Sequence, residues 1–143
     1  MRNFIYPARL RSEPEGGFTV SFADVAEAIT YGCDRREALM QAADCLEEAV
    51  ANRIALKMEL PEASGLKRGQ VAVQLPALMA AKAALYLAVK DEGISNVELA
   101  RRLGCDEREV RRMLDPRHAT KIERIDEALA VFGMRLVVSV EAA

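Results

Sequence analysis

Residues 95–114 have the sequence SNVELARRLGCDEREVRRML, and this stretch decides the fold of the C-terminal half. Ser95 and Asp106 each stand three residues before a glutamate, which is the spacing of a capping box at the start of a helix. Gly104 separates the two predicted helices, at a turn that requires positive φ or a close backbone approach. An alanine four residues before this glycine and a valine six residues after it complete the spacing of a helix-turn-helix.

The second helix of this pattern carries the candidate DNA contacts, because in a helix-turn-helix it enters the major groove. Arginine binds guanine through two hydrogen bonds, and the free N–H groups at a helix start suit a phosphate. From Arg101 to Arg124 the chain holds eight Lys and Arg against five Asp and Glu. Many helical bundles with a glycine turn never touch DNA, so a solvated charged face is the alternative. The residues expected to contact DNA are Glu107, Arg108, Arg111, Arg112, Arg117, Thr120 and Lys121.

The first half has the two-residue period of strands. Alternating apolar residues predict strands over 3–11, 17–22, 28–31 and 71–75. Asp34 and Glu37 form a capping box before an amphipathic helix of about 18 residues. The predicted order is β-β-β-α-β, which resembles part of the ribonuclease H fold.

The spacing of apolar residues changes near Pro76 from the two-residue period of strands to the period of helices, and this change marks the predicted domain boundary. Residues 1–76 form the first predicted domain, and residues 77–143 form an all-helical second one. Thr120 and Glu123 form one more capping box before its last helix. Residues 134–141 alternate again and predict a terminal strand. The expected class is therefore α+β.

Composition excludes several classes of protein. The chain has 143 residues, 51% hydrophobic and 29% charged, with a net charge of -2, which is ordinary for a globular protein. Three cysteines without a CxxC and a single histidine argue against a zinc site and indicate reduced thiols in the cytoplasm. The N-terminus has no apolar signal region, and no stretch is apolar enough for a membrane span. We expect no metal and no cofactor.

Catalysis is not expected from the first half either. Ribonuclease H chemistry uses two metal ions held by several converging carboxylates, and the strand over 3–11 has none. Asp24 and Glu27 follow the second strand without an evident partner cluster, and the lone His118 precedes a helix. We predict a binding module with no catalytic residues. A metal-dependent nuclease with Asp24 as a ligand, and a repressor that senses a small molecule, remain the alternatives.

Six segments of the chain together resemble one family, the HicB antitoxins of bacterial type II toxin–antitoxin systems. They are FIYPARL at 4–10, GGFTVSF-x-D at 16–24, AIT-x-G at 28–32, EAL at 37–39, ISNVELARRLGC at 94–105 and REVRRMLDPRHATKIERIDEAL at 108–129. The resemblance covers nearly the whole chain. The chain differs from the usual family pattern at two places. Ala23 stands where the family commonly has proline, and residues 26–27 stand where the family commonly has proline-glycine.

The resemblance implies a division of labour. The N-terminal half, a degenerate ribonuclease H-like module, covers HicA, a small toxin whose catalytic histidine cuts mRNA. The C-terminal half binds operator DNA and represses the operon, and members form homodimers or larger assemblies such as homotetramers. If the terminal strand pairs with its copy in a second chain, two-fold symmetry requires an inverted-repeat operator.

An RNA-cutting partner carries a basic surface, so acidic residues of the antitoxin are the candidates for toxin contact. Residues 1–76 hold 11 Asp and Glu against 9 Lys and Arg, whereas residues 77–143 balance at 11 and 11. Opposite potentials speed encounter and orient docking. For any single residue, a solvated loop charge is the alternative. The acidic residues expected to lie near one sheet edge are Glu13, Glu15, Asp24 and Glu27.

Overall fold

The structure is a computed structural model that describes residues 1–142. The chain divides into two compact units, Met1–Ala80 and Ala81–Ala143. The division falls within helix α2 (Ala77–Glu92), just after the change of period near Pro76. Across residues 1–142, no helix combines the length and the apolar character that crossing a bilayer requires.

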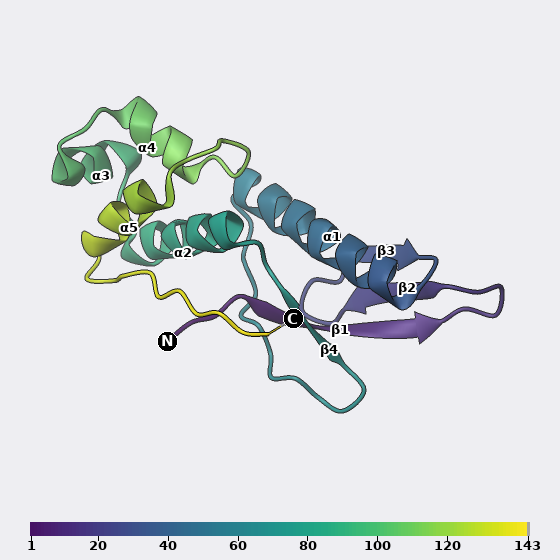
Figure 1. The fold of residues 1–143 in the computed structure, drawn as a ribbon. Coiled ribbons are helices and arrows are strands. Elements are labelled where there is room, and N and C mark those ends of the chain that lie inside the picture. Colours follow the sequence, from purple (N-terminus) through teal and green to yellow (C-terminus); the bar gives the residue numbers. More distant parts are fainter. Residues whose placement is uncertain (143) are drawn as a thin grey trace. The chain divides into compact units, whose positions relative to one another are not determined.

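The N-terminal unit is a four-stranded antiparallel sheet with one long helix against it (Figure 1). The sheet has the order β3-β2-β1-β4, so the last strand of the unit pairs with the first. This confirms the expected α+β class and the β-β-β-α-β order. The elements are β1 (Ile5–Ser12), β2 (Phe18–Phe22), β3 (Ile29–Gly32), α1 (Arg35–Ala55) and β4 (Val71–Gln74).

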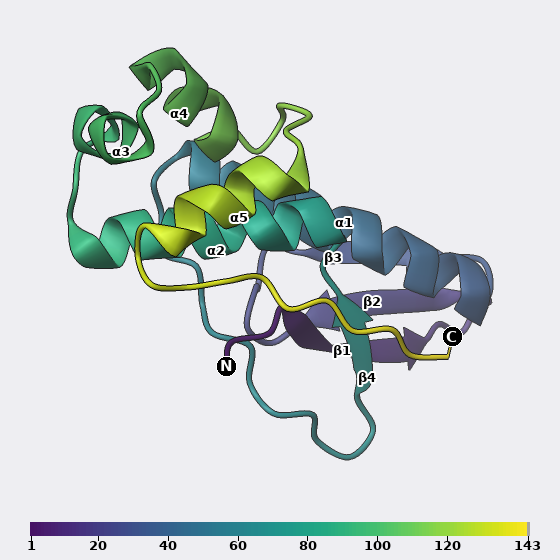
Figure 2. The ribbon, with the colours of Figure 1, turned by 60° about the vertical axis from the view of Figure 1, so that its left-hand side comes forward.

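Alternation along the strands decides which face of the sheet α1 covers. Leu10 pairs with Val20, and Val20 with Thr30, so these positions share one face. Apart from Pro7, the buried side chains of the strands lie on this face, and α1 lies along it (Figure 2). The buried positions of α1 recur at three- and four-residue steps, and they are Ala38, Ala42, Leu46, Val50, Ala51 and Ile54.

The start of α1 is fixed by close packing and by its cap. A Cβ atom at Gly32 would lie 2.2 Å from the backbone nitrogen of Ala38, so only glycine fits there. Asp34 Oδ1 accepts a hydrogen bond from the Glu37 backbone N–H at 2.8 Å, and Glu37 Oε2 accepts one from Cys33 N–H at 2.6 Å. The predicted cap is confirmed, and the helix runs for 21 residues.

The C-terminal unit is helical, with α3 (Asn96–Leu103), α4 (Glu107–Leu114) and α5 (Ile122–Ala130) following α2. The Ser95 and Asp106 side chains each accept a backbone hydrogen bond at 3.1 Å from the residue three positions later. Gly104 ends α3 with φ of 67°, in the left-handed region that favours glycine. The predicted geometry of 95–114 is therefore confirmed. The hydrophobic core between these helices contains five fully buried residues: Leu99, Val110, Met113, Ile125 and Leu129.

Two local predictions for this unit are wrong. The residue before α5 is Lys121, which makes no side-chain cap, because the Thr120 hydroxyl is engaged with other groups. Residues 134–142 form no strand, since a strand needs a second strand beside it; instead the Leu136 backbone N–H donates to Asp126 Oδ1 at 2.8 Å. Alternation alone does not supply that second strand.

Candidate nucleic-acid interface

Helix α4 presents one apolar face and one charged face. Val110 and Met113 are buried against the neighbouring helices, three residues apart, as the helical repeat requires. The rest of the helix surface is polar, and its four predicted DNA contacts are all exposed. They are Glu107, Arg108, Arg111 and Arg112.

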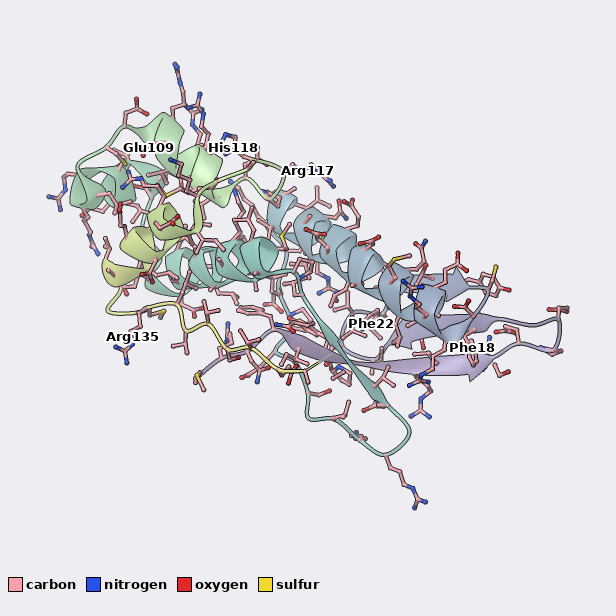
Figure 3. The ribbon with its side chains drawn as sticks, viewed as in Figure 1. Phe18, Phe22, Glu109, Arg117, His118 and Arg135 are labelled. Carbon is pink, nitrogen blue, oxygen red and sulfur yellow. The ribbon has the colours of Figure 1, made fainter. Side chains whose placement is uncertain are left out.

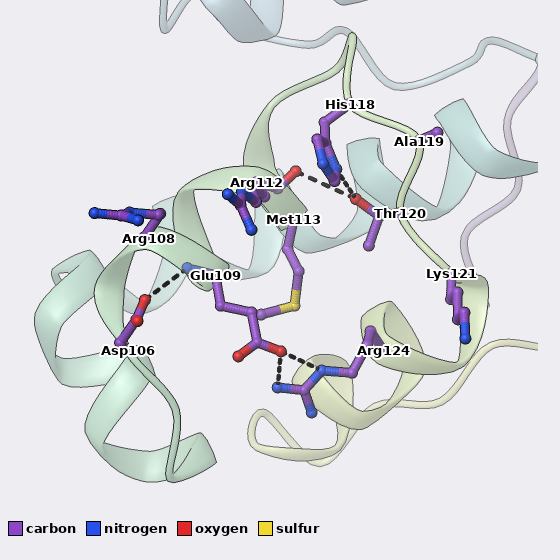
Figure 4. Close-up of a pocket in the computed structure, with 10 residues that line it drawn as sticks. All are labelled: Asp106, Arg108, Glu109, Arg112, Met113, His118, Ala119, Thr120, Lys121 and Arg124. Carbon is purple, nitrogen blue, oxygen red and sulfur yellow. Dashed lines mark hydrogen bonds and ion pairs between the residues drawn. The ribbon is translucent and has the colours of Figure 1, made fainter.

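A cavity of about 400 Å³ opens between α4, the turn 115–121 and the start of α5 (Figure 4). The turn carries Arg117 and His118, with Glu109 on α4 nearby (Figure 3). Four of the seven predicted DNA contacts lie at this cavity. The lining residues are Asp106, Arg108, Glu109, Arg112, Met113, His118, Ala119, Thr120, Lys121 and Arg124.

The acidic groups of this cavity already have partners. Asp106 accepts the capping hydrogen bond of α4. Glu109 Oε1 accepts two hydrogen bonds from Arg124, at 2.8 and 2.5 Å, and Arg124 also contacts Glu127. These carboxylates raise the pKa of Arg124. Arg124 therefore compensates part of this negative charge within the protein.

The cations of the cavity have fewer partners. Within residues 1–142, Arg108, Arg112 and Lys121 form no ion pair. Arg111 lies 3.8 Å from Glu107, and both side chains are exposed, so this contact is weak. The cavity therefore offers an open positive charge, which suits a phosphate or the acceptor edge of a guanine.

The neighbouring helix α3 contrasts with α4, because its arginines are bound internally. Glu98 accepts hydrogen bonds from Arg101 at 2.9 and 2.6 Å and from Arg102 at 3.0 Å. The two guanidinium groups hold the pKa of Glu98 at about 2. The open positive charge of this region therefore belongs to α4 and the turn after it.

One functional candidate escaped the sequence analysis. Lys82 on α2 is only 1% exposed, and its ammonium group contacts Arg112, Asp115 and Thr120. A signal was present, since this lysine lies four residues after Leu78 and three before Leu85, on the apolar face of the helix. A charged residue on an apolar face predicts a specific polar partner.

The four acidic residues proposed for partner binding do not lie together. Glu13 and Glu15 lie in the turn before β2, whereas Asp24 and Glu27 follow its end. A strand rises about 3.3 Å per residue, so the length of β2 separates the two pairs by roughly 15 Å. They form two separate sites, at opposite ends of one strand.

Three of these four carboxylates are engaged inside the unit. Glu13 Oε1 accepts hydrogen bonds from Thr19 at 2.7 Å and from Arg11 at 3.2 Å, and these contacts lower its pKa. Glu27 receives two hydrogen bonds from Arg53, at 2.5 and 2.9 Å, which lower its pKa as well.

Asp24 is an anchor for the loop before β4. Its Oδ2 accepts hydrogen bonds from the Ser64 backbone N–H at 2.9 Å and from the Ser64 hydroxyl at 3.0 Å. Tyr6 Oη donates to the Pro61 carbonyl at 2.9 Å, and Arg53 donates to the Glu59 carbonyl at 3.0 Å. In the described part of the chain, no three His, Cys, Asp or Glu side chains converge as metal ligands would. Asp24 thus has a structural role in this unit.

Known proteins similar to this chain are antitoxins. Residues 5–84 match the family described as HicB-like antitoxin of bacterial toxin–antitoxin system. The chain is 36% identical over 141 residues to antitoxin HicB 1 of Photorhabdus laumondii, covering 99% of this chain and 90% of that protein. It is 36% identical to antitoxin HicB of Pseudomonas fluorescens, covering 98% and 96%. Antitoxin HicB of Escherichia coli K12 is 35% identical, with 92% and 95% covered.

Proposed function

The chain belongs to the HicB-like family of antitoxins, and from this premise we propose that it neutralises a HicA-type, mRNA-cleaving toxin and represses its own operon. In this proposal the C-terminal unit binds operator DNA and the N-terminal unit binds the toxin. Neither unit acts as an enzyme.

The observation that carries the DNA-binding half is the open positive charge around α4. Arg108 and Arg112 project from the exposed face of a helix whose other face is locked into the core. Lys121 stands at the start of α5, where the first N–H groups have no side-chain cap. This arrangement supports the proposal that arginines on α4 contact base edges and that the start of α5 contacts a phosphate.

The toxin-binding half rests on the family and on the charge of the N-terminal unit. Glu15 is exposed in the turn before β2 and has no hydrogen bond or ion pair among the described residues, so its charge is available to a cationic partner. Glu13, Asp24 and Glu27 add to the field of the unit while they hold its loops in place. Such a field speeds the encounter with a basic nuclease more than it sets affinity.

We also propose that the chain acts as a homodimer, or a homotetramer built from dimers. In the segment after Gly133, Val137, Val138 and Val140 are 65%, 84% and 94% exposed. Pairing of this segment with its copy in a second chain would bury these side chains and supply the missing strand partner. The dimer would then read an inverted repeat.

One experiment on the full chain tests both halves. Its affinity for a duplex covering its own promoter is measured by gel shift, beside a shuffled duplex of equal length. Growth is measured in cells that express a HicA-type toxin, with and without the chain. We expect selective DNA binding and rescue of growth. Equal affinity for both duplexes would overturn the repressor role, and a lack of rescue would overturn the antitoxin role.

A further inference from the structure

Lys82 differs from every other charged residue in the described part of the chain, because it is the one that is buried. Burial removes the ammonium group from water, which destabilises its charged form and lowers the pKa of Lys82 to about 8. The nearby Asp115 opposes this effect. Lys82 is still largely protonated at pH 7, so the core of the C-terminal unit contains a positive charge.

The ammonium group is satisfied by three oxygens, one for each of its hydrogens. The Lys82 Nζ atom donates to the Arg112 carbonyl at 3.0 Å, to the Asp115 carbonyl at 2.6 Å and to the Thr120 hydroxyl at 2.9 Å. No buried side-chain nitrogen or oxygen among the described residues lacks a partner. The lysine is therefore held in one position by its surroundings.

These oxygens come from the two parts of the candidate DNA interface. Arg112 lies in the last turn of α4, where carbonyl groups have no partner within the helix and a positive charge is favoured. Thr120 lies at the end of the turn that follows, and its hydroxyl also contacts the Arg112 carbonyl at 3.3 Å and His118 Nδ1 at 3.1 Å. One nitrogen atom thus joins the end of α4 to the turn before α5.

We propose that Lys82 is a positioning residue for DNA recognition, which sets α4 and the turn 115–121 at the spacing that operator DNA requires. This inference rests on the proposed DNA-binding function. Lys82 itself is buried and touches no DNA; it acts through Arg112, whose carbonyl it binds and whose guanidinium group lines the open cavity. Removing its amine breaks three hydrogen bonds and leaves the Thr120–Arg112 hydrogen bond of 3.3 Å in place, so α4 and the turn are held less firmly while the exposed charges stay the same.

The test compares Lys82→Met with the full wild-type chain. Methionine keeps the apolar stem and removes the amine, and Lys90→Met makes the same change at an exposed position of the same helix. Each protein is titrated with the promoter duplex and with a shuffled duplex at several salt concentrations. We expect Lys82→Met to lower affinity for the promoter by roughly 10-fold or more, which is comparable to the loss of one base contact.

The same variant should keep its affinity for the shuffled duplex and its salt dependence, because no phosphate contact is lost. A merely structural role would reduce the folded fraction and lower the affinity for both duplexes equally. Lys90→Met should behave as the wild type does. Equal losses on both duplexes, or no loss on the promoter, would overturn the proposal.

A DNA-free measurement separates this inference from the proposed function. Amide hydrogen exchange at pH 7 should be faster in Lys82→Met than in the wild type for residues 112–121, with the core of α3 unchanged. If the wild type binds no promoter DNA, the DNA-binding function fails, while this measurement still tests the link between α4 and the turn. Unchanged exchange over 112–121 would overturn the positioning role.

Lys82→Gln guards against a misfolded methionine variant, because its amide keeps two donors with a reach one bond shorter. We expect it to fold, by circular dichroism, and to show the same selective loss of promoter binding to a smaller degree. If neither variant folds, Lys82 is required for stability as such, and the positioning role is overturned.

Discussion

Most of the acidic residues predicted for partner binding in the N-terminal unit are engaged, whereas the cations around α4 are largely open. In the N-terminal unit, Glu13, Asp24 and Glu27 are bound to groups of the same unit and hold its loops. In the C-terminal unit, Arg108, Arg112 and Lys121 have no ion pair among the described residues. Net charge does not show this, since residues 1–76 carry the more negative balance although several of their carboxylates are engaged. Whether a charged group is free to bind a partner molecule depends on the residues beside it in the folded chain.

The strongest test of this comparison removes the segment after Gly133. We expect the shortened chain to be monomeric and to bind operator DNA roughly 100-fold or more weakly, because two linked half-site contacts become one. Sedimentation and gel shift measure the two effects, and toxin rescue in cells serves as the control for the N-terminal unit. A shortened chain that sediments as the full-length assembly does would contradict the proposed role of the segment.

The buried charge of the C-terminal unit predicts a dependence of stability on pH. The pKa of Lys82 lies at about 8 in the folded chain, below the ordinary lysine value of 10.5. Between these values the unfolded chain binds more protons, so the free energy of unfolding rises with pH, by about 3 kcal/mol from this group. The free energy of unfolding is measured for the wild type and Lys82→Met by denaturant titration from pH 7.5 to 10.5, with reductant. The rise with pH should be larger in the wild type. If the free energy of unfolding changes with pH in the same way for both proteins, the lowered pKa of Lys82 is wrong.

Loss of an open arginine on α4 should have an effect of similar or smaller size. Arg108→Ala or Arg112→Ala should weaken operator binding by about 1–3 kcal/mol if the guanidinium group binds guanine. Arg68→Ala, which removes an exposed arginine from the N-terminal unit, is the matched control. The control should bind operator DNA as the wild type does, and all three variants should still bind the toxin. Unchanged operator affinity for both α4 variants would show that Arg108 and Arg112 are not DNA contacts.

A fourth experiment compares an ion-paired residue of the N-terminal unit with an unpaired one, by their effects on stability and on toxin association. Arg53→Met removes three hydrogen bonds to Glu27 and Glu59 and should lower the free energy of unfolding by about 1–2 kcal/mol. Glu15→Gln should leave stability unchanged and slow toxin association slightly, with the difference vanishing as salt rises. Denaturant titration and stopped-flow mixing measure these effects. Loss of stability in Glu15→Gln would show that its charge is engaged as well.

The sequence predicted the parts of this structure that depend on neighbours three or four residues apart. The caps at Asp34, Ser95 and Asp106 are of this kind, because the side chain and the N–H group that it binds are close in the chain. The turn at Gly104 and the alternation of the first three strands are local for the same reason. The exposed face of α4 follows from the helical repeat alone.

Contacts between distant residues were decided only by the tertiary structure. Asp24 and Ser64 are 40 positions apart, and Lys82 and Thr120 are 38 apart, so the sequence does not show which residue is paired with which. The expected strand over 134–141 shows the same limit, because alternation specifies one strand and a sheet needs two. Local spacing therefore determined the elements, their caps and the exposed face of α4. Which charges remain open, and which one is buried beneath that face, was decided by packing, since burial and pairing depend on groups that only the fold brings together.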